Sequence, residues 1–440
     1  MNTGLSVIMP SLNVADYIEE CINSALNQTL NEMEIICIDA GSEDGTWEIL
    51  KRYENTGDSG KRVRLIRSDV KSYGYQVNLG IELAVGKYVA VLETDDMADE
   101  RMYEHLVGLA ERYALDFVKA DYDCFYTLKK GERYYERVSL LRGARDRYNS
   151  VSDPSDDDYL YAHDCSIWAG IFNRNFLRRN NIRLNETEGA AYQDIGFALQ
   201  VLACAKRAYY SDHSFYRYRR DRETSSANSP YGLRYSRREF ERLLSDDGIR
   251  DRLKCRQGFY WRMAGSFAAE YWKASAGCST EPLQIQSDYE WFRRILTEAV
   301  ERAEFDMDRL PDGFRKELLF ILEDGGRYAE EVRMREEERR RAADRLLRTV
   351  GGNDAAVFGA GRRGKAAVVS LLQIGIKPIR VYDNNEGIWG EHIYGVTIGR
   401  PEKPADNVTV FIANKLNGRE IMKQMTDMGI PREQIAWWEG

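Results

Sequence analysis

Three carboxylates stand together where an apolar run of the sequence stops. In the stretch VAVLETDDM, residues 89–97, the side chains of Glu93, Asp95 and Asp96 follow the run Val-Ala-Val-Leu. Adjacent carboxylates repel one another, and a cation or a proton usually offsets the repulsion. Their oxygens are hard ligands that suit Mg²⁺ or Mn²⁺. We therefore expect a divalent metal site here, with Asp96 alone interpreted as the N-cap of the helical pattern that follows.

The elements that would position these carboxylates alternate between strand and helix patterns. Strands are expected at 5–10, 34–40, 63–68 and 87–92, and helices at 15–29, 46–55 and 75–86. Strands that are apolar throughout and separated by helices indicate a parallel sheet covered on both faces. The sequence therefore predicts an α/β fold for the first part of the chain.

In such sheets, ligands bind beyond the carboxyl ends of the strands. Polar residues stand at three of these ends: Ser11 and Asn13 after the first strand, Asp39 and the turn GSEDG after the second, and Glu93 onward after the fourth. We expect these segments to converge on one crevice.

The rest of the chain divides into further parts. Residues 116–128 read as a strand, and residues 168–182 and 193–207 read as helices. Helical periodicity dominates 236–350 and ends in a highly charged run, interpreted as a solvated helix or spacer rather than a binding element. The last ninety residues return to alternating strands and helices. We predict domains at 1–235, 236–350 and 351–440.

Composition excludes some classes of function. The 440 residues are 43% hydrophobic and 30% charged, and the net charge is −8, which disfavours nucleic-acid partners. No run is long and apolar enough to span a bilayer, so we expect a cytoplasmic protein. The seven cysteines have no CxxC pairing and are interpreted as reduced thiols.

Four motifs in this order resemble the family-2 glycosyltransferases, which have the GT-A fold and transfer a sugar from a nucleoside diphosphate with inversion. They are LSVIMPSLN, EIICIDAGSEDGTWEIL, GYQVNLGIELAVGKYVAVLETDD and YQDIGF, within about the first 220 residues. The resemblance implies nucleotide contacts from Asp39 and Asp44, with a polar turn and an N-cap as their structural alternatives. It also implies that Asp95 and Glu93 hold Mn²⁺ or Mg²⁺ on the donor diphosphate, or that Glu93 contacts the ribose.

The resemblance further assigns the catalytic base to Asp194, which could instead cap the following helix. Asn78 is expected to orient the nucleotide or the sugar. Pro10, Ser11, Asn13 and Thr94 complete the expected donor-binding residues. The chain departs from the family pattern at Ala40, Val77, Glu93 and Gln193.

A basic stretch follows, with Arg217, Arg219, Arg220 and Arg222. One or two of them, Arg217 foremost, are expected to contact the diphosphate, with the loop at Ser225 and Ser226 as a lid. Others would meet an anionic acceptor or a membrane surface, or remain solvated. His213 is interpreted as structural rather than metal-binding.

Near the C-terminus, Gly359, Gly361 and Gly364 have GxGxxG spacing between a strand and a helix, and Asp383 follows about twenty residues later. The pattern is typical of a Rossmann-like module. It predicts nucleotide or nucleotide-sugar binding, regulation or oligomerisation, with a purely structural unit as the alternative.

The leading hypothesis is a glycosyltransferase that uses a UDP-type donor and a glycan, lipid-linked or protein acceptor. The alternatives are a nucleotide-sugar-binding protein that has lost catalysis, and a nucleotidyl or polyol-phosphate transferase on a related sheet.

Overall fold

The computed structural model describes residues 4–54, 61–127, 133–142, 144–220, 222, 229, 231–253, 255–277, 282–414 and 417–438. The chain forms two compact units. The first comprises Met1–Cys124 and Arg137–Val332, and the second comprises Phe125–Glu136 and Arg333–Gly440. The division at 235 and 350 that the sequence suggests remains a prediction about folding units.

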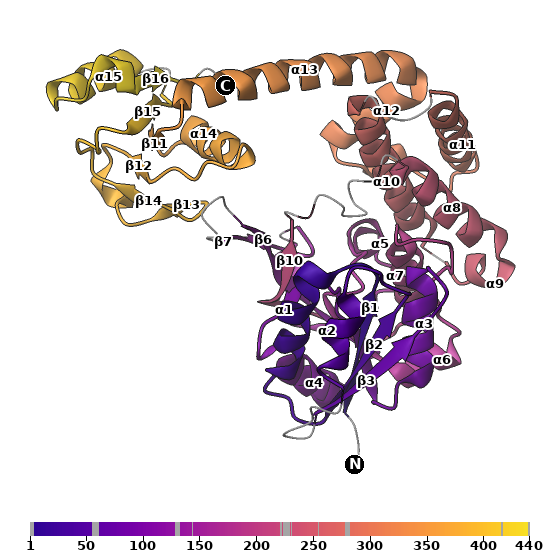
Figure 1. Ribbon diagram of the computed structural model, residues 1–440. Coiled ribbons are helices and arrows are strands. Elements are labelled where there is room, and N and C mark those ends of the chain that lie inside the picture. The colour runs from indigo at the N-terminus through magenta and orange to yellow at the C-terminus, as the bar shows by residue number, and fades with distance from the viewer. Residues whose placement is uncertain are drawn as a thin grey trace. The chain divides into compact units, whose positions relative to one another are not determined.

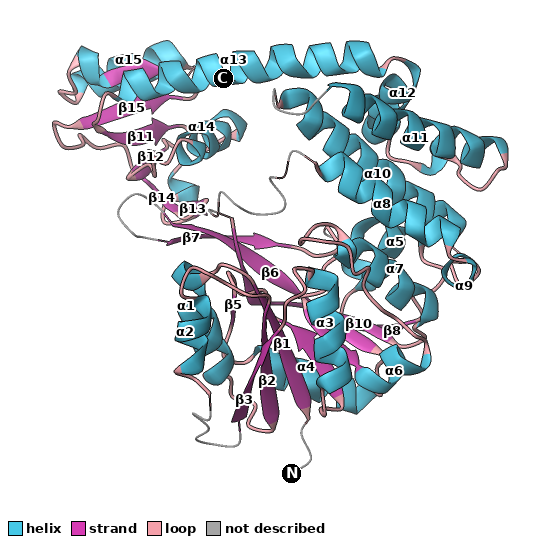
Figure 2. Cartoon of the chain, turned by 45° about the vertical axis from the view of Figure 1, so that its right-hand side comes forward, coloured by secondary structure: helices cyan, strands magenta, loops and turns pink. Residues whose placement is uncertain are grey.

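A ten-stranded sheet forms the centre of the first unit, with the main strand order β3-β2-β1-β4-β9-β6-β10-β5 (Figure 2). The first four strands in this order are parallel, and β9 pairs antiparallel with β4 and with β6. In addition, β7 pairs with β6 and β8 pairs with β10. The strands are β1 (Leu5–Ser11), β2 (Met33–Asp39), β3 (Lys61–Arg67), β4 (Tyr88–Val91), β5 (Met97–Ala98), β6 (Phe117–Thr127), β7 (Arg133–Val138), β8 (Val151–Ser152), β9 (Gly170–Asn173) and β10 (Ala208–Arg219).

Both faces of this sheet are buried. Along β1, Val7 and Met9 pack in one hydrophobic cluster and Ile8 packs in another, as the alternation of a strand requires. The helices α1 (Ala15–Leu26) and α4 (Met102–Tyr113) contribute to the first cluster, and α3 (Tyr73–Leu83) and α7 (Gln193–Cys204) contribute to the second. At Gly80 of α3 an added Cβ would lie 2.5 Å from a side-chain carbon of Ile8, so only glycine permits this close approach.

The second cluster continues into a group of helices that follows the sheet in sequence (Figure 1). In the first unit, the helices therefore share one hydrophobic core with the sheet. The remaining helices are α2 (Thr46–Lys51), α5 (Asp158–His163), α6 (Arg174–Arg179), α8 (Gly232–Ser245), α9 (Asp247–Arg250), α10 (Arg256–Ala276), α11 (Pro282–Glu301), α12 (Asp312–Glu323) and α13 (Gly325–Val350), the last of which runs into the second unit.

The second unit has its own six-stranded sheet in the order β13-β14-β12-β11-β15-β16. All pairs are parallel except β13–β14. Helices α14 (Arg362–Gln373) and α15 (Gly418–Asp427) contribute to separate hydrophobic clusters on its two faces. The strands are β11 (Asp354–Phe358), β12 (Arg380–Tyr382), β13 (His392–Ile393), β14 (Val396–Gly399), β15 (Val408–Ile412) and β16 (Ile435–Trp437).

The α/β fold class and the parallel order of the early strands are confirmed. The helix expected over 168–182 is wrong in its first half, because Gly170–Asn173 forms β9 between β4 and β6. An apolar run this short has no periodicity that separates strand from helix. No helix in the described parts of the chain is both long and apolar enough to cross a membrane.

Candidate active site

The carboxyl ends of β1 and β4 open into a cavity of about 1390 Å³ within the first unit. Pro10, Glu93, Thr94 and Asp95 line it, and the Thr94 hydroxyl donates to the Pro10 carbonyl at 2.9 Å. This bond joins the two strand ends across the sheet. Of the segments expected to converge, Leu12, Ala40 and the residues Glu93 to Asp95 line the cavity, whereas the polar side chains of Ser11, Asn13 and Asp39 do not.

Each carboxylate after β4 has a different partner. Glu93 accepts a 2.5 Å hydrogen bond from the hydroxyl of Tyr73, and Asp95 pairs with Arg222 at 3.0 Å. Asp96 is buried and accepts from the hydroxyl of Tyr216 and from the backbone N–H of Arg219. The N-cap expected at Asp96 is wrong, because the following helix begins at Met102 with Arg101 at the N-cap position. Burial, together with the neighbouring charges of Asp95 and Asp194, raises the pKa of Glu93 to about 8. Glu93 is therefore largely protonated at neutral pH unless a cation binds beside it.

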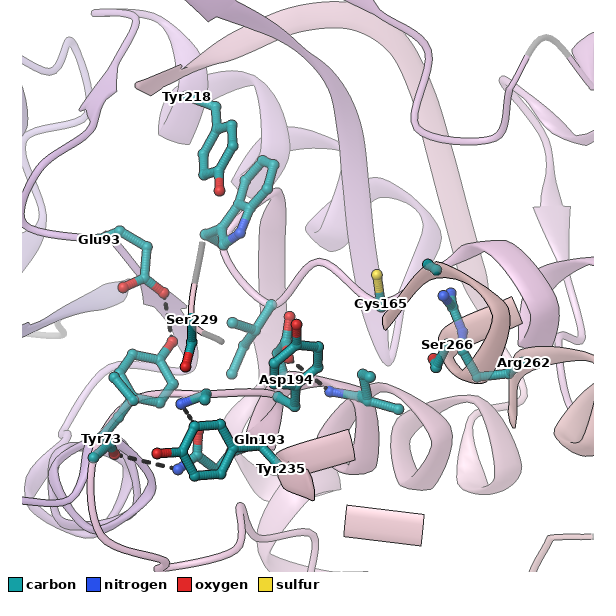
Figure 3. A pocket seen from close by; sticks show the side chains of 18 of the residues that line it. Tyr73, Glu93, Cys165, Gln193, Asp194, Tyr218, Ser229, Tyr235, Arg262 and Ser266 are labelled. Atoms are coloured by element: carbon teal, nitrogen blue, oxygen red, sulfur yellow. Dashed lines mark hydrogen bonds between the residues drawn. The ribbon is translucent and has the colours of Figure 1, made fainter. Parts of the chain in front are cut away.

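Asp194 lines the same cavity from the first turn of α7 (Figure 3). It accepts a 3.0 Å hydrogen bond from the backbone N–H of Ile195, and burial raises its pKa to about 6. The neighbouring Gln193 holds the preceding loop through bonds to Ala191, Thr187 and Gly189. Asp194 thus combines a half-buried carboxylate in the cavity wall with a pKa close to neutral, which suits a general base.

The loops behind the cavity are held by the predicted nucleotide residues. Asp39 is buried and accepts hydrogen bonds from the N–H groups of Gly41 and Ser42 and from the Ser42 hydroxyl. Gly41 and Gly45 adopt φ values of 79° and 100°, as a tight turn requires. Ser11 pairs with Asp39 in the sheet register and is also buried.

Two further side chains join this turn to the start of α1. Asn13, with φ of 52°, accepts from the N–H of Glu43, and Asp44 accepts from the N–H groups of Ala15 and Thr46. These bonds fix the backbone of the loop. Contacts of Ser11, Asn13, Asp39 and Asp44 with a nucleotide remain predictions.

Like the four residues of these loops, the predicted donor residues Asn78 and Arg217 do not line the cavity. The side chain of Asn78 bonds to both backbone groups of Leu184 and to Glu186, so it clamps that segment to α3. Arg217 forms ion pairs with Asp99 and Asp123. Among the neighbouring arginines, Arg222 lines the cavity. The predicted lid at Ser225 and Ser226 lies outside the described residues.

Comparison with known proteins shows which proteins this chain resembles. Residues 6–174 match the model of glycosyl transferase family 2. Within the first unit, this segment is therefore similar to the family-2 glycosyltransferases. It is 33% identical over 221 residues to the uncharacterized glycosyltransferase YibD of Escherichia coli, covering 49% of this chain and 60% of that protein. It is 29% identical over 232 residues to the uncharacterized glycosyltransferase EpsJ of Bacillus subtilis, covering 52% and 64%.

The chain therefore spans less than two thirds of the length of these curated relatives. The fold is also similar to the crystal structure of residues 1–349 of TarS from S. aureus, with a TM-score of 0.52 and 16% identity over 78% of this chain and 91% of that one. A structure of the same TarS segment in complex with UDP matches equally well. The GT-A fold predicted for the first part of the chain is confirmed.

The cavity of the first unit offers few metal ligands. In the described residues, no group of three or more His, Cys, Asp and Glu side chains is placed to hold a metal ion. Mg²⁺ is often held by only one or two carboxylates together with substrate phosphates and water. Asp95 and Glu93 line one cavity and fit that requirement, provided that Asp95 exchanges Arg222 for the metal. His213 instead lies against His105, with ring centroids 4.8 Å apart.

Several side chains that line the cavity of the first unit belong to no recognisable sequence motif. Tyr73 begins α3, and His163, Trp261 and Arg262 come from α5 and α10. Burial lowers the pKa of His163 to about 4, so this imidazole is neutral at physiological pH. No motif marks these four residues, because their helices reach the cavity only through tertiary packing.

In the second unit, the glycines form the loop between β11 and α14. Gly359 has φ of 111°, and a Cβ on Gly364 would lie 1.7 Å from the carbonyl oxygen of Gly359. Asp383 accepts hydrogen bonds from the N–H groups of Ala360 and Asn385, so it supports the loop. A cavity of about 670 Å³ lies beside Gly361 at the start of α14. Nucleotide binding by Gly359, Gly361, Gly364 and Asp383 remains a prediction.

Proposed function

We propose that the protein is an inverting glycosyltransferase that moves a sugar from a nucleoside diphosphate donor to a hydroxyl group of a glycan, a lipid-linked or a protein acceptor. The observation that carries this proposal is one cavity containing Asp194 together with the carboxylates after β4. The similarity of residues 6–174 to glycosyl transferase family 2 supports the reaction class. UDP is the first donor nucleotide to test, since the similar TarS structure was solved with it.

In the proposed reaction, the acceptor oxygen bonds to the anomeric carbon as the bond from that carbon to the diphosphate oxygen breaks. The electron pair of the broken bond leaves with the nucleoside diphosphate, and the hydroxyl proton passes to Asp194. A carboxylate with a pKa of about 6 is ionised at neutral pH and can still accept that proton. Attack from the face opposite the leaving group inverts the anomeric carbon.

The donor diphosphate would lie at the ends of β1 and β4, where Glu93 and Asp95 meet Arg222. Asp95 and Glu93 would hold Mn²⁺ or Mg²⁺ there, and the ion would supply charge neutralisation for the leaving diphosphate. Arg222 offers a guanidinium to the same phosphate oxygens once it is released from Asp95.

A nucleotide-sugar-binding protein without catalysis is the second candidate. The pairing of Asp95 with Arg222 and the three hydrogen bonds that Asp39 accepts from its own loop favour it.

Donor hydrolysis separates the two candidates. The full chain is incubated with a panel of UDP-, GDP- and dTDP-sugars and Mn²⁺, with and without EDTA, and release of the nucleoside diphosphate is followed. Release from one donor that EDTA abolishes is expected for the transferase. A thermal shift with UDP but no release from any donor, with or without a mixed glycan acceptor pool, would favour the binding protein. No shift and no release would refute both.

A further inference from the structure

The cavity of the first unit extends past Asp194 along one face of α10. Trp261, Gly265, Ala268 and Trp272 line it at helical spacing, so the wall presents two indole rings separated by small residues. A Cβ added at Gly265 would meet no atom within 4 Å, which means that this part of the wall borders open space. None of these residues belongs to the segment that matches the family model.

Arg262 stands on the same stretch of α10 and has an incomplete set of partners. Its Nε donates to the carbonyl of Tyr161 at 3.2 Å. Its Nη2 is shielded from solvent and has no hydrogen-bond partner in the described part of the chain. Nor does any described carboxylate lie within ion-pair distance of it.

An arginine side chain keeps its charge at every physiological pH, and a buried donor without a partner costs free energy. A phosphate or carboxylate supplied by a ligand would satisfy this guanidinium through charge-assisted hydrogen bonds.

The position of Arg262 relates it to the acceptor rather than the donor. Figure 3 shows Arg262 and Ser266 on one side of Asp194, and Glu93 and Tyr73 on the other. Burial raises the pKa of Asp194, and the positive charge of Arg262 opposes that rise, so the two groups interact across the cavity. If the donor diphosphate lies beside Glu93 and Asp95, as the proposed function requires, the α10 side is left for the acceptor.

The other charged groups on this side have partners of their own or lie at its edge. Lys273 pairs with Glu270 at 2.7 Å, and Glu317 accepts from the hydroxyl of Tyr328 at 2.7 Å. Arg142 lines the cavity but is exposed. Arg262, half-buried and with its Nη2 shielded from solvent, is therefore the cation best placed to select a charged ligand.

Resting on the proposed function, we infer that the acceptor is a sugar or polyol bearing a phosphate or carboxylate group, that Arg262 binds this anion, and that the indole rings of Trp261 and Trp272 stack on the acceptor ring or chain. The anion anchors the acceptor so that a neighbouring hydroxyl reaches Asp194. A neutral acceptor would leave Nη2 of Arg262 without a charged partner.

The test is equilibrium binding of three matched probes to the full chain in the presence of UDP: methyl glucoside, methyl glucoside 6-phosphate and methyl glucuronide. Calorimetry is expected to show at least about tenfold tighter binding of an anionic probe than of the neutral one. Comparison of the two anionic probes distinguishes phosphate from carboxylate recognition. Arg262→Gln should abolish the preference, whereas Arg256→Gln, near the start of α10 and outside the cavity lining, should retain it.

Gly265→Leu provides a second variant that is expected to fold, because leucine favours a helix and the space is open. It should weaken binding of all three probes by filling the α10 side. The thermal shift given by UDP checks that each variant is folded.

Equal affinity for neutral and anionic probes, no binding of any probe, or an unchanged preference in Arg262→Gln would each overturn the inference. A wild-type chain that responds to UDP and releases nucleoside diphosphate but shows no anion preference would refute only the acceptor assignment. A chain that does neither would refute the proposed function itself.

Discussion

Replacing Asp194 by asparagine should make the protein both less active and more stable, and the size of each effect follows from its environment. Burial raises the pKa of Asp194 from an ordinary value of 3.8 to about 6. A difference of about two units corresponds to about 3 kcal/mol of unfavourable free energy when the folded protein must ionise this group. The stabilising contribution of the protonated form is fully present below about pH 4 and is lost as the pH rises through about 6.

Asp194→Asn keeps an oxygen that can accept from the N–H of Ile195 but cannot ionise. The variant should therefore unfold at higher denaturant concentration than the wild type at pH 8, by up to about 3 kcal/mol, and the two should converge below pH 4. Transfer should fall by about 10²- to 10⁴-fold because the base is lost. In the wild type, kcat/KM should fall about tenfold per pH unit below about 6 and level off above it.

Urea unfolding at pH 4 and pH 8 and a pH profile of donor turnover with acceptor present measure these effects. Thermal shifts with UDP should be the same for wild type and variant, since the proposed nucleotide site lies beside other residues. A variant that retains transfer within about threefold of wild type, or that is less stable at pH 8, would refute the assignment of Asp194 as a half-buried base.

Three further predictions concern Asp95 at the proposed metal site, the glycine loop of the second unit, and a buried ion pair in the first unit. Asp95→Asn should weaken UDP binding about tenfold or more with Mn²⁺ present but not with EDTA, and an unchanged calorimetric metal titration would contradict its role. Gly364→Ala should destabilise the second unit by about 3 kcal/mol because its Cβ would lie 1.7 Å from a carbonyl oxygen, whereas Gly361→Ala, with no atom within 4 Å, should be nearly neutral in thermal unfolding. Lys119→Met should cost roughly 3–5 kcal/mol in urea unfolding, because it leaves the fully buried Asp164 without its ion-pair partner at 2.6 Å; a loss near zero would show that Asp164 is neutralised or solvated.

The sequence predicts the sheet well where the chain obeys local rules. Three of the four parallel strands, β1, β2 and β4, are buried throughout, and all four are separated by helices, so the alternation of strand and helix patterns identifies them. The strand β9 is missed because Gly170–Asn173 is short and its pairing with β4 and β6 depends on distant segments. Strand partners that are far apart in sequence have no local signature.

The candidate site divides in the same way. The strand-end rule predicts one crevice for the segments after β1, β2 and β4, and Pro10, Ala40 and Asp95 do line one cavity, whereas the polar residues Ser11, Asn13 and Asp39 do not. It does not predict that Arg222 would reach Asp95, or that Tyr73 would donate to Glu93, because both contacts depend on how loops and helices settle against the sheet. Residue type alone could not show this division of partners among neighbouring carboxylates.

The cavity also draws its two ends from different parts of the chain, and this bears on what can vary in such an enzyme. Apart from Arg222, the end that includes Glu93 and Asp95 comes from elements within residues 6–174, the segment that matches the family. Asp194 and Arg262 come from helices beyond that segment. A nucleoside diphosphate presents the same phosphates whatever acceptor is used, so one set of strand ends can serve many donors of that class. Acceptors differ in shape and charge. Changes on the face of α10 that lines the cavity can alter acceptor binding without disturbing the sheet. Substitutions along α10 should therefore change acceptor preference while leaving the affinity for UDP within about twofold of wild type, as expected for sites without shared partners. A parallel loss of UDP affinity would show instead that the two ends of the cavity are coupled.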